Sequence, residues 1–172
     1  YPIGKFKFYD TPDIDKKIVS KNLKILDQFH AKLKSELNKI PTNYLSKPYR
    51  DGGWSIYKLI HHLADSHMHA YIRCKYAYIS DKIRIMDYVP DEWANTEDCS
   101  FENINYSLII IKGIHKRWVS FFSKLKNEDF KKQYFYKERN KFYSIYNVIG
   151  LYAWHCNHHL KHIENFRKNI KN

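Results

Sequence analysis

Apolar residues recur every three or four positions in four long segments of the chain, which is the spacing of one buried face on an α-helix. In the first segment these residues are Val19, Leu23, Leu26, Phe29, Leu33, Leu37 and Ile40. Thr11, Pro12 and Asp13 have the order of a helix start, with a cap, a proline and then an acid, and the helix must end before Pro41. The pattern therefore predicts a first long helix between these limits.

Three further helices are predicted downstream. Ser55 is a suitable N-cap for a second helix that runs to about Ser80. The third helix carries the apolar residues Phe101, Ile104, Leu108, Ile111, Trp118 and Phe122. Ser144 is expected to cap a fourth helix that runs to about Asn169.

The segments between these helices differ in character. Residues 1–10 form an aromatic arm expected to lie across the domain, and residues 81–100 are polar and irregular. Residues 130–143 are aromatic and partly alternating around a turn-like Arg-Asn-Lys, which predicts a small hairpin or an extended crossover before the last helix. We therefore expect residues 1–172 to form a single all-α domain, a four-helix bundle with long connections.

Composition excludes several classes of protein. The formal charge is +12, but the lysines are spread along the chain without a block of like charge, so nucleic-acid binding is not expected. No apolar run approaches the roughly 18 residues of a membrane span, and the first residues do not resemble a signal peptide. The three cysteines are odd in number and form no Cys-x-x-Cys pair, which favours a reducing, cytoplasmic location.

The histidines are concentrated in two windows, residues 61–69 and 155–162, which are predicted to lie on the second and fourth helices. Eight of the ten histidines of the chain lie there: His61, His62, His67, His69, His155, His158, His159 and His162. Imidazole is a common ligand of zinc and nickel. Two helices that bring histidines to one core can supply three ligands and leave a coordination position open, as in catalytic metal sites.

Helical phase selects among the histidines of the fourth helix, because each residue advances about 100° around the helix axis. Its apolar stripe is centred near Tyr152, and both His155 and His159 lie within that stripe on adjacent turns. His158 lies about 120° away, and His162 lies just beyond the edge of the stripe at about 80°. His155 and His159 are therefore expected to point inward together.

On the second helix the same calculation places His62 with the apolar residues, within about 60° of Leu59. His61 points nearly opposite, and His67 and His69 fall on the two flanks. The predicted ligands of a divalent metal are therefore His62, His155 and His159.

Two histidines outside the windows, His30 and His115, also lie on apolar stripes and are expected to be hydrogen-bonded core residues. His115 is the one that could hydrogen-bond near the metal site. The sequence contains no Glu-x-x-His repeat of a di-iron bundle, no His-Glu-x-x-His pattern of a metalloprotease and no Gly-x-Ser-x-Gly nucleophile signature. These alternatives are excluded.

Two stretches resemble a known family: residues 51–73, DGGWSIYKLIHHLADSHMHAYIR, and residues 150–163, GLYAWHCNHHLKHI. They are similar to the YfiT-type branch of the DinB-like superfamily, whose members are described as metal-dependent hydrolases and as bacillithiol S-transferases. The resemblance implies a DinB-like four-helix bundle, often dimeric, that binds nickel or zinc through three histidines. The ligand positions of the family fall on His62, His155 and His159, with His162 at the third position of the motif.

These features together predict a metal-dependent enzyme with a His₃ site for zinc or nickel, either a thiol S-transferase of the bacillithiol type or a hydrolase. Its partners would be a small-molecule substrate, such as an electrophile, a low-molecular-weight thiol and a second copy of the chain. Asp65, Ser66 and His162 are candidates for orienting the ligands or moving protons, and Tyr88 and Trp93 could wall the mouth of the site. The alternative is a non-catalytic, metal-binding stress-response module.

Overall fold

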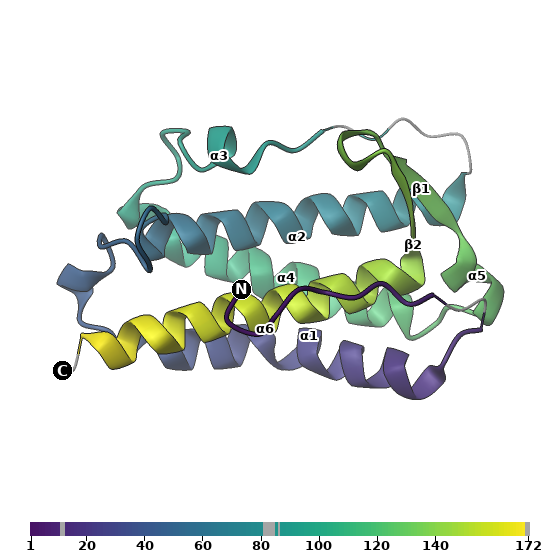
Figure 1. The fold of residues 1–172 in the computed structure, drawn as a ribbon, viewed down its shortest axis with the longest axis horizontal. Helices are drawn as coiled ribbons and strands as arrows, with labels where there is room; N and C mark the ends of the chain where they lie inside the picture. The colour runs from purple at the N-terminus through teal and green to yellow at the C-terminus, as the bar shows by residue number, and fades with distance from the viewer. Residues whose placement is uncertain (11–12, 81–84, 86, 171–172) are drawn as a thin grey trace.

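The computed structural model describes residues 1–10, 13–80, 85 and 87–170. Four long helices dominate this part of the chain (Figure 1): α1 (Lys16–Leu37), α2 (Ile56–Ile79), α4 (Ile104–Phe122) and α6 (Ile145–Asn169). Its shorter elements are η1 (Thr42–Tyr44), α3 (Pro90–Trp93), η2 (Phe101–Asn103), α5 (Asn127–Lys131), β1 (Gln133–Tyr136), η3 (Lys137–Arg139) and β2 (Lys141–Ser144).

The long helices form a bundle in which α1 and α2 lie on opposite corners. Both of these helices pack against α4 and α6, and the chain between them runs across one end of the bundle (Figure 1). The four-helix bundle predicted from the apolar spacing is therefore confirmed. Because α2 and α6 are neighbours, the two histidine windows face each other across the bundle interior.

The helix starts follow the capping rules, with one exception to the prediction. The Ser55 hydroxyl accepts a hydrogen bond from the Lys58 amide, and the Ser144 hydroxyl accepts one from Asn147, so both predicted caps are confirmed. The start proposed for the first helix was wrong: α1 begins at Lys16, because the Asp15 carboxylate caps it by accepting the Lys17 amide at 2.7 Å. Thr11 and Pro12 lie outside the described residues.

Some connecting segments contain short elements that the pattern did not predict. The third helix starts with the 3₁₀ turn η2, and α5 buries Phe130 before the hairpin. Residues 81–84 and 86, part of the segment expected to be irregular, lie outside the described residues. Pro90 in that segment begins α3, where a proline at the first helical position loses no hydrogen bond.

The predicted hairpin before the last helix is confirmed. Strands β1 and β2 pair antiparallel, and the turn between them contains Asn140 in the left-handed conformation with φ 45°. The paired Tyr134 and Tyr143 are buried with stacked rings, whereas their neighbours Phe135 and Phe142 point outward. The hairpin therefore places tyrosines over the end of the bundle between α2 and α6.

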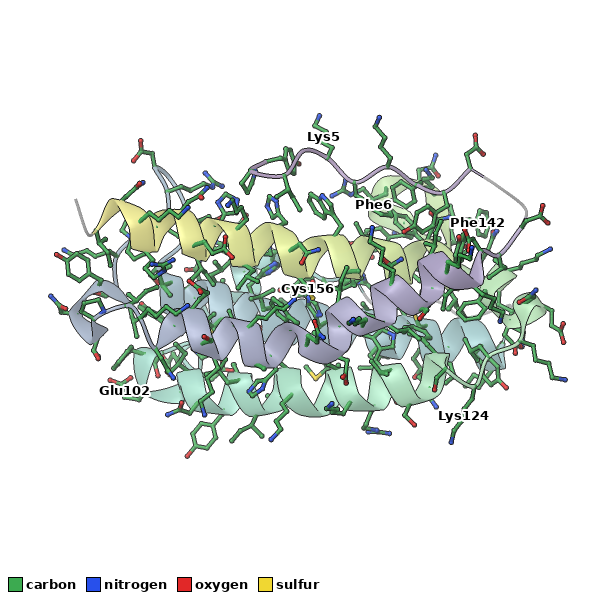
Figure 2. All side chains as sticks on the ribbon, turned by 90° about the horizontal axis from the view of Figure 1, so that it is seen from below. Lys5, Phe6, Glu102, Lys124, Phe142 and Cys156 are labelled. Carbon is green, nitrogen blue, oxygen red and sulfur yellow. The ribbon has the colours of Figure 1, made fainter. Side chains whose placement is uncertain are left out.

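The N-terminal arm lies along the outer face of α6, as the views in Figures 1 and 2 agree. The Tyr9 amide donates to the Asn147 side chain at 2.7 Å, and the Trp154 indole donates to the Gly4 carbonyl at 3.2 Å. Gly150 lies under the Tyr9 ring, where any larger side chain would overlap that ring. The arm thus covers a face of α6 that would otherwise meet solvent.

Among the described residues, the helices are not both long and apolar enough to cross a membrane.

Candidate metal centre

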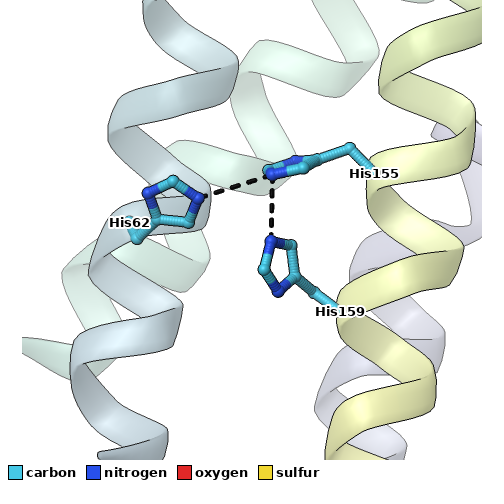
Figure 3. Close-up of side chains that lie close together, drawn as sticks. All are labelled: His62, His155 and His159. Carbon is cyan, nitrogen blue, oxygen red and sulfur yellow. Dashed lines mark hydrogen bonds between the residues drawn. The ribbon is translucent and has the colours of Figure 1, made fainter. Parts of the chain in front are cut away.

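The structure brings the three predicted ligands together between α2 and α6. Nε2 of His155 lies 3.4 Å from Nε2 of His62 and 2.9 Å from Nε2 of His159 (Figure 3). His155 and His159 reach the site from adjacent turns of α6, and His62 faces them from α2 (Figure 3). One ligand nitrogen from each residue lies within 4.8 Å of the others.

This arrangement fits a divalent cation with nitrogen ligands. Zinc–nitrogen bonds of about 2.0–2.1 Å in a tetrahedral site place neighbouring nitrogens about 3.4 Å apart. The observed separations of 3.4 and 2.9 Å are close to that value, so small side-chain rotations would complete the geometry. The group contains three imidazoles and no carboxylate, a donor set that suits zinc or nickel better than magnesium or calcium.

Burial keeps these imidazoles in the protonation state that metal binding requires. It lowers the pKa of His62 to about 4. Burial, strengthened by the neighbouring imidazoles, holds the pKa values of His155 and His159 well below their usual range. All three side chains are therefore neutral at pH 7 and carry a lone pair for a cation.

A row of hydrogen bonds joins His155 to the opposite side of the bundle. Nδ1 of His155 lies 3.0 Å from Nε2 of His67, and Nδ1 of His67 lies 2.8 Å from Nε2 of His115. Nδ1 of His115 lies 2.8 Å from the carbonyl oxygen of Leu26 on α1. The predicted hydrogen bonding of His115 near the site is thus realised through His67.

The direction of these hydrogen bonds fixes the tautomer of His155. Because a carbonyl oxygen only accepts, His115 must donate from Nδ1 to Leu26, which leaves its Nε2 as an acceptor. Burial lowers the pKa values of His67 and His115, so each neutral ring has a single proton to donate. His67 therefore donates to His115, and His155 donates to His67 from Nδ1. The remaining lone pair of His155, on Nε2, points at the other two candidate ligands.

The other two candidate ligands are held differently. Nδ1 of His62 lies 3.0 Å from the Tyr88 hydroxyl, and a hydrogen bond donated there leaves the His62 lone pair on Nε2. Nδ1 of His159 is buried and has no hydrogen-bond partner among the described residues. His159 is therefore oriented by packing and by the contact of its Nε2 with His155.

A second group, His67, His115 and Cys156, also has ligand atoms within 4.8 Å of one another. The facing nitrogens of His67 and His115 are only 2.8 Å apart and are already joined by the hydrogen bond described above. Burial raises the pKa of the Cys156 thiol well above its usual range, so the thiolate that binds metal is disfavoured. We interpret this group as a structural neighbour of the candidate metal centre.

Three histidines do not lie where helical phase placed them. His61, expected to point away from the core, is buried with Nδ1 2.8 Å from Ser107 Oγ and Nε2 2.8 Å from the Ser100 carbonyl oxygen. His158, also expected to face outward, is buried against the rings of Tyr1 and Trp154. His61 is covered by α4 and by the Ser100 segment, and His158 by the N-terminal arm, and a phase calculation on single helices does not include these neighbours.

The third of these histidines is His67, which was placed on a flank and is completely buried at the centre of the hydrogen-bonded row. The sequence held one signal for this position. The flank of α2 that carries His67 meets the apolar stripe of α4, where His115 was expected to lie. That signal could be used only once the packing of α2 against α4 was known.

The candidates for supporting roles are distributed around the site. Among the described residues, neither Asp65 nor His162 makes a hydrogen bond to a ligand imidazole, and their roles stay predictions. His162 packs against the Tyr49 ring, and burial together with the nearby Asp98 raises the pKa of Asp65 to about 6. The Ser66 hydroxyl lies 3.3 Å from that of Tyr152 at the edge of the site.

A cavity of about 380 Å³ lies beside the three histidines and is lined by residues of α2, α6, the hairpin and the arm. His62 and His155 form part of its wall, so it reaches the candidate metal centre. Tyr88 lines it as well, whereas Trp93 packs behind Tyr88 with ring centroids 5.4 Å apart. A pocket of this size can hold a small molecule.

Comparison with known proteins agrees with this architecture. A protein of Oceanobacillus iheyensis named as a metal-dependent hydrolase is 38% identical over 168 residues, which cover 98% of this chain and 95% of that protein. YfiT of Bacillus subtilis is 34% identical over 163 residues, covering 95% of this chain and 90% of YfiT.

The solved structure of YfiT is described as that of a probable metal-dependent hydrolase with an unusual four-helix bundle topology. It matches with a TM-score of 0.94 and 32% identity, and the match covers 99% of this chain and 97% of that one. The family model of the DinB superfamily matches residues 25–163. The chain therefore belongs to the DinB superfamily.

Proposed function

We propose that this protein is a metal-dependent enzyme that acts on a small molecule bound in the cavity between α2 and α6. His62, His155 and His159 would hold a divalent cation, zinc or nickel. Such a cation, when bound by three neutral ligands, acidifies a water or a thiol and polarises a carbonyl group. The observation that carries the proposal is the convergence of three neutral imidazole nitrogens beside a cavity large enough for a substrate.

The residues around the ligands have defined tasks in this proposal. His67 and His115 hold the ring of His155 in one tautomer, and Tyr88 does the same for His62. Burial keeps all of these groups neutral near pH 7. The arm and the hairpin, which wall the cavity, would limit the access of bulk water to the substrate.

Metal analysis of the purified protein tests the first step of the proposal. We expect one divalent ion per chain in the wild type and none in His62→Ala or His159→Ala. His30→Ala is the matched control, because His30 lies on α1 away from the site. Uptake of metal by the ligand variants at the wild-type level would contradict the assignment.

The names of the relatives favour hydrolysis as the reaction, and the transfer of a small thiol, such as bacillithiol, is the second candidate. The chain does not supply a nucleophilic thiol itself, because Cys74, Cys99 and Cys156 are buried and burial raises the pKa of each. A thiol nucleophile would therefore come from a diffusible molecule. Free buried cysteines also fit the reducing cytoplasm that we propose as the location.

One assay separates the two reactions. The metal-loaded protein is incubated with a low-molecular-weight thiol and monochlorobimane, and in parallel with 4-nitrophenyl acetate without thiol. Conjugation that is lost in His62→Ala supports thiol transfer, whereas ester cleavage lost in the same variant supports hydrolysis. Tight metal binding with neither activity would favour the non-catalytic, stress-response alternative.

We also propose that the protein forms a homodimer through α4. Tyr106 and Ile109 are 66% and 65% exposed, and with Ile110 they form one apolar stripe on the outer face of that helix. Such a stripe on a single helix can pair with its own copy across a twofold axis. Sedimentation of the wild type and of Ile109→Lys tests this, with a dimer expected only for the former.

A further inference from the structure

We propose that the end of the bundle that carries the hairpin is a docking surface for an anionic lipid membrane. The surface combines exposed apolar side chains of α2 and the hairpin with exposed cations of α2 and α4. It uses the outer face of the hairpin, whereas the cavity lies against the inner face. Membrane docking would therefore be independent of the proposed metal-dependent function.

Large apolar side chains are exposed along the last turns of α2 and on the outer face of the hairpin. They are Ile72, Tyr76, Tyr78, Ile79, Phe135 and Phe142. Ile79 is 66% exposed and Phe142 is 61% exposed. Ile72, Tyr76 and Ile79 share one face of α2, because they follow one another at steps of four and three residues. An exposed group of this kind marks a surface that interacts with another molecule or with a membrane.

These side chains form one continuous apolar patch. The ring centroids of Phe135 and Phe142 lie 5.1 Å apart, and both rings line a shallow groove together with Tyr76. The next hollow adjoins that groove and contains Tyr78 and Ile79. The patch therefore extends from the hairpin onto the end of α2.

Cations border the apolar patch on the side of α4. The ring centroid of Tyr78 lies 5.3 Å from that of Phe121, and the Lys75 ammonium lies over the Phe121 ring, 4.8 Å from its centroid. Phe121 and Lys75 line an open hollow together with Arg117 and Lys124. The apolar patch and the cations thus form one surface at the end of the bundle.

The charge of this surface is not compensated by neighbouring acids. Within the described part of the chain, Lys75, Arg117 and Lys124 form no ion pair, although Lys116 and Lys132 are each paired with an aspartate. The described residues that line the groove and the two hollows include no aspartate or glutamate. Three cations are therefore left to attract an anionic partner.

An anionic bilayer fits both parts of the surface. Lysine and arginine attract lipid phosphate groups, while apolar and tyrosine side chains enter the interfacial layer. A second copy of the chain would bring Lys75, Arg117 and Lys124 of both copies to one interface, where like charges repel. A nucleic acid could stack its bases on Tyr78, but it offers no apolar environment for Ile79.

The hairpin would connect this surface with the cavity. Phe135 and Phe142 are paired across the two strands and point outward, as described above, whereas the neighbouring pair, Tyr134 and Tyr143, lines the cavity. Figure 2 shows Phe142 and Lys124 at the same end of the bundle. Docking through this end would hold the cavity close to the lipid.

The first experiment measures sedimentation of the full chain with lipid vesicles. Vesicles of phosphatidylcholine alone are compared with vesicles of phosphatidylcholine and phosphatidylglycerol in equal parts. Each basic residue near an anionic membrane surface strengthens binding about fivefold, so three unpaired cations predict a preference of about 100-fold for the anionic vesicles. Raising the salt concentration from about 0.05 M to about 0.5 M should remove most of this preference.

The second experiment compares matched variants on the anionic vesicles. Lys124→Gln should weaken binding about fivefold, whereas Lys168→Gln, which removes an exposed charge near the other end of the bundle, should not change it. Phe142→Ser should weaken binding about tenfold, because an apolar side chain no longer enters the membrane. Phe101→Ser, which removes an exposed ring at the start of α4, should bind as the wild type does.

Equal binding of the wild type to both kinds of vesicle, or no binding to either, would overturn the proposal, and this measurement needs no variant. An equal loss of binding in Lys124→Gln and Lys168→Gln would contradict the assignment to this surface, since net charge alone would then direct binding. Binding of oligothymidine without binding of vesicles would assign the surface to nucleic acid and overturn the proposal.

Discussion

Two imidazole clusters lie side by side in the bundle and differ in the hydrogen-bond partners of their ring nitrogens. In the cluster of His62, His155 and His159, Nε2 of His155 faces Nε2 of both other rings, and the printed contacts of these three Nε2 atoms are with one another. In the row of His67 and His115, each nitrogen has a partner, and the row ends on the Leu26 carbonyl oxygen. Burial makes the histidines of both clusters neutral near pH 7. What differs is the acceptor of the hydrogen bonds. Where the row of imidazoles ends on a carbonyl oxygen, every ring nitrogen is used in a hydrogen bond, whereas the other cluster keeps nitrogen lone pairs that could bind a cation.

Acidification should have the largest effect on the free energy of unfolding. In the unfolded chain each histidine binds a proton near pH 6.5, whereas burial holds the pKa values of His62 and His115 near 4. Stability is therefore complete above pH 6.5 and is lost as the pH falls toward 4. Between pH 7 and 5 the loss is about 2 kcal/mol for each such imidazole.

Urea unfolding of metal-free protein between pH 7 and 4.5 measures this loss. Zinc should raise the free energy of unfolding without reducing its pH dependence, because a bound metal keeps the candidate ligands deprotonated while the unfolded chain still takes up protons. The row of His67 and His115 should lose stability with or without zinc. A free energy of unfolding that stays constant down to pH 5 would show that these imidazoles are not buried as described.

Removing a ligand should have the next largest effect. His155→Ala is expected to lower metal affinity by more than about 100-fold, because even outer partners of ligands are worth about 10- to 100-fold. Competition with a chelating dye measures the affinity. His30→Ala should bind as the wild type does, and a His155→Ala protein with unchanged affinity would place the metal elsewhere.

Breaking the row without touching a ligand should have a smaller effect. In His67→Phe the ring is kept but the acceptor for His155 is lost, so His155 can exchange between tautomers. Metal affinity should fall by about 10- to 100-fold. Nitrogen-15 chemical shifts of His155 should move from a single Nδ1–H tautomer toward a mixture. With His30→Phe as the control, an unchanged tautomer in His67→Phe would refute the role of the row.

The smallest effect is expected at Asp65. Burial raises the pKa of this carboxyl to about 6, so its ionised form costs stability above that pH and the cost disappears as the pH falls. The residue is only half-buried, and Asp65→Asn should therefore raise the free energy of unfolding at pH 7 by about 1 kcal/mol. Metal affinity should change little. A large loss of affinity in Asp65→Asn would instead support its predicted role beside the ligands.

Helical periodicity predicted the bundle and the facing of the three candidate ligands, because both depend on local spacing within single helices. The caps at Ser55 and Ser144 are equally local. The start of α1 was predicted wrongly because several residues in that region could cap a helix, and the structure uses Asp15. The burial of His61 depends on α4 and on the Ser100 segment, and that of His158 depends on the N-terminal arm. Such long-range contacts leave no period in the sequence.

The Leu26 carbonyl that ends the hydrogen-bonded row belongs to the main chain of α1, a helix that provides no ligand. A main-chain acceptor cannot be removed by exchanging a side chain, so point mutations at Leu26 leave the anchor in place. Only a shift or rotation of α1 can withdraw it. The direction in which the Nε2 lone pair of His155 points into the candidate metal centre therefore depends on the position of α1, the helix at the opposite corner of the bundle from α2.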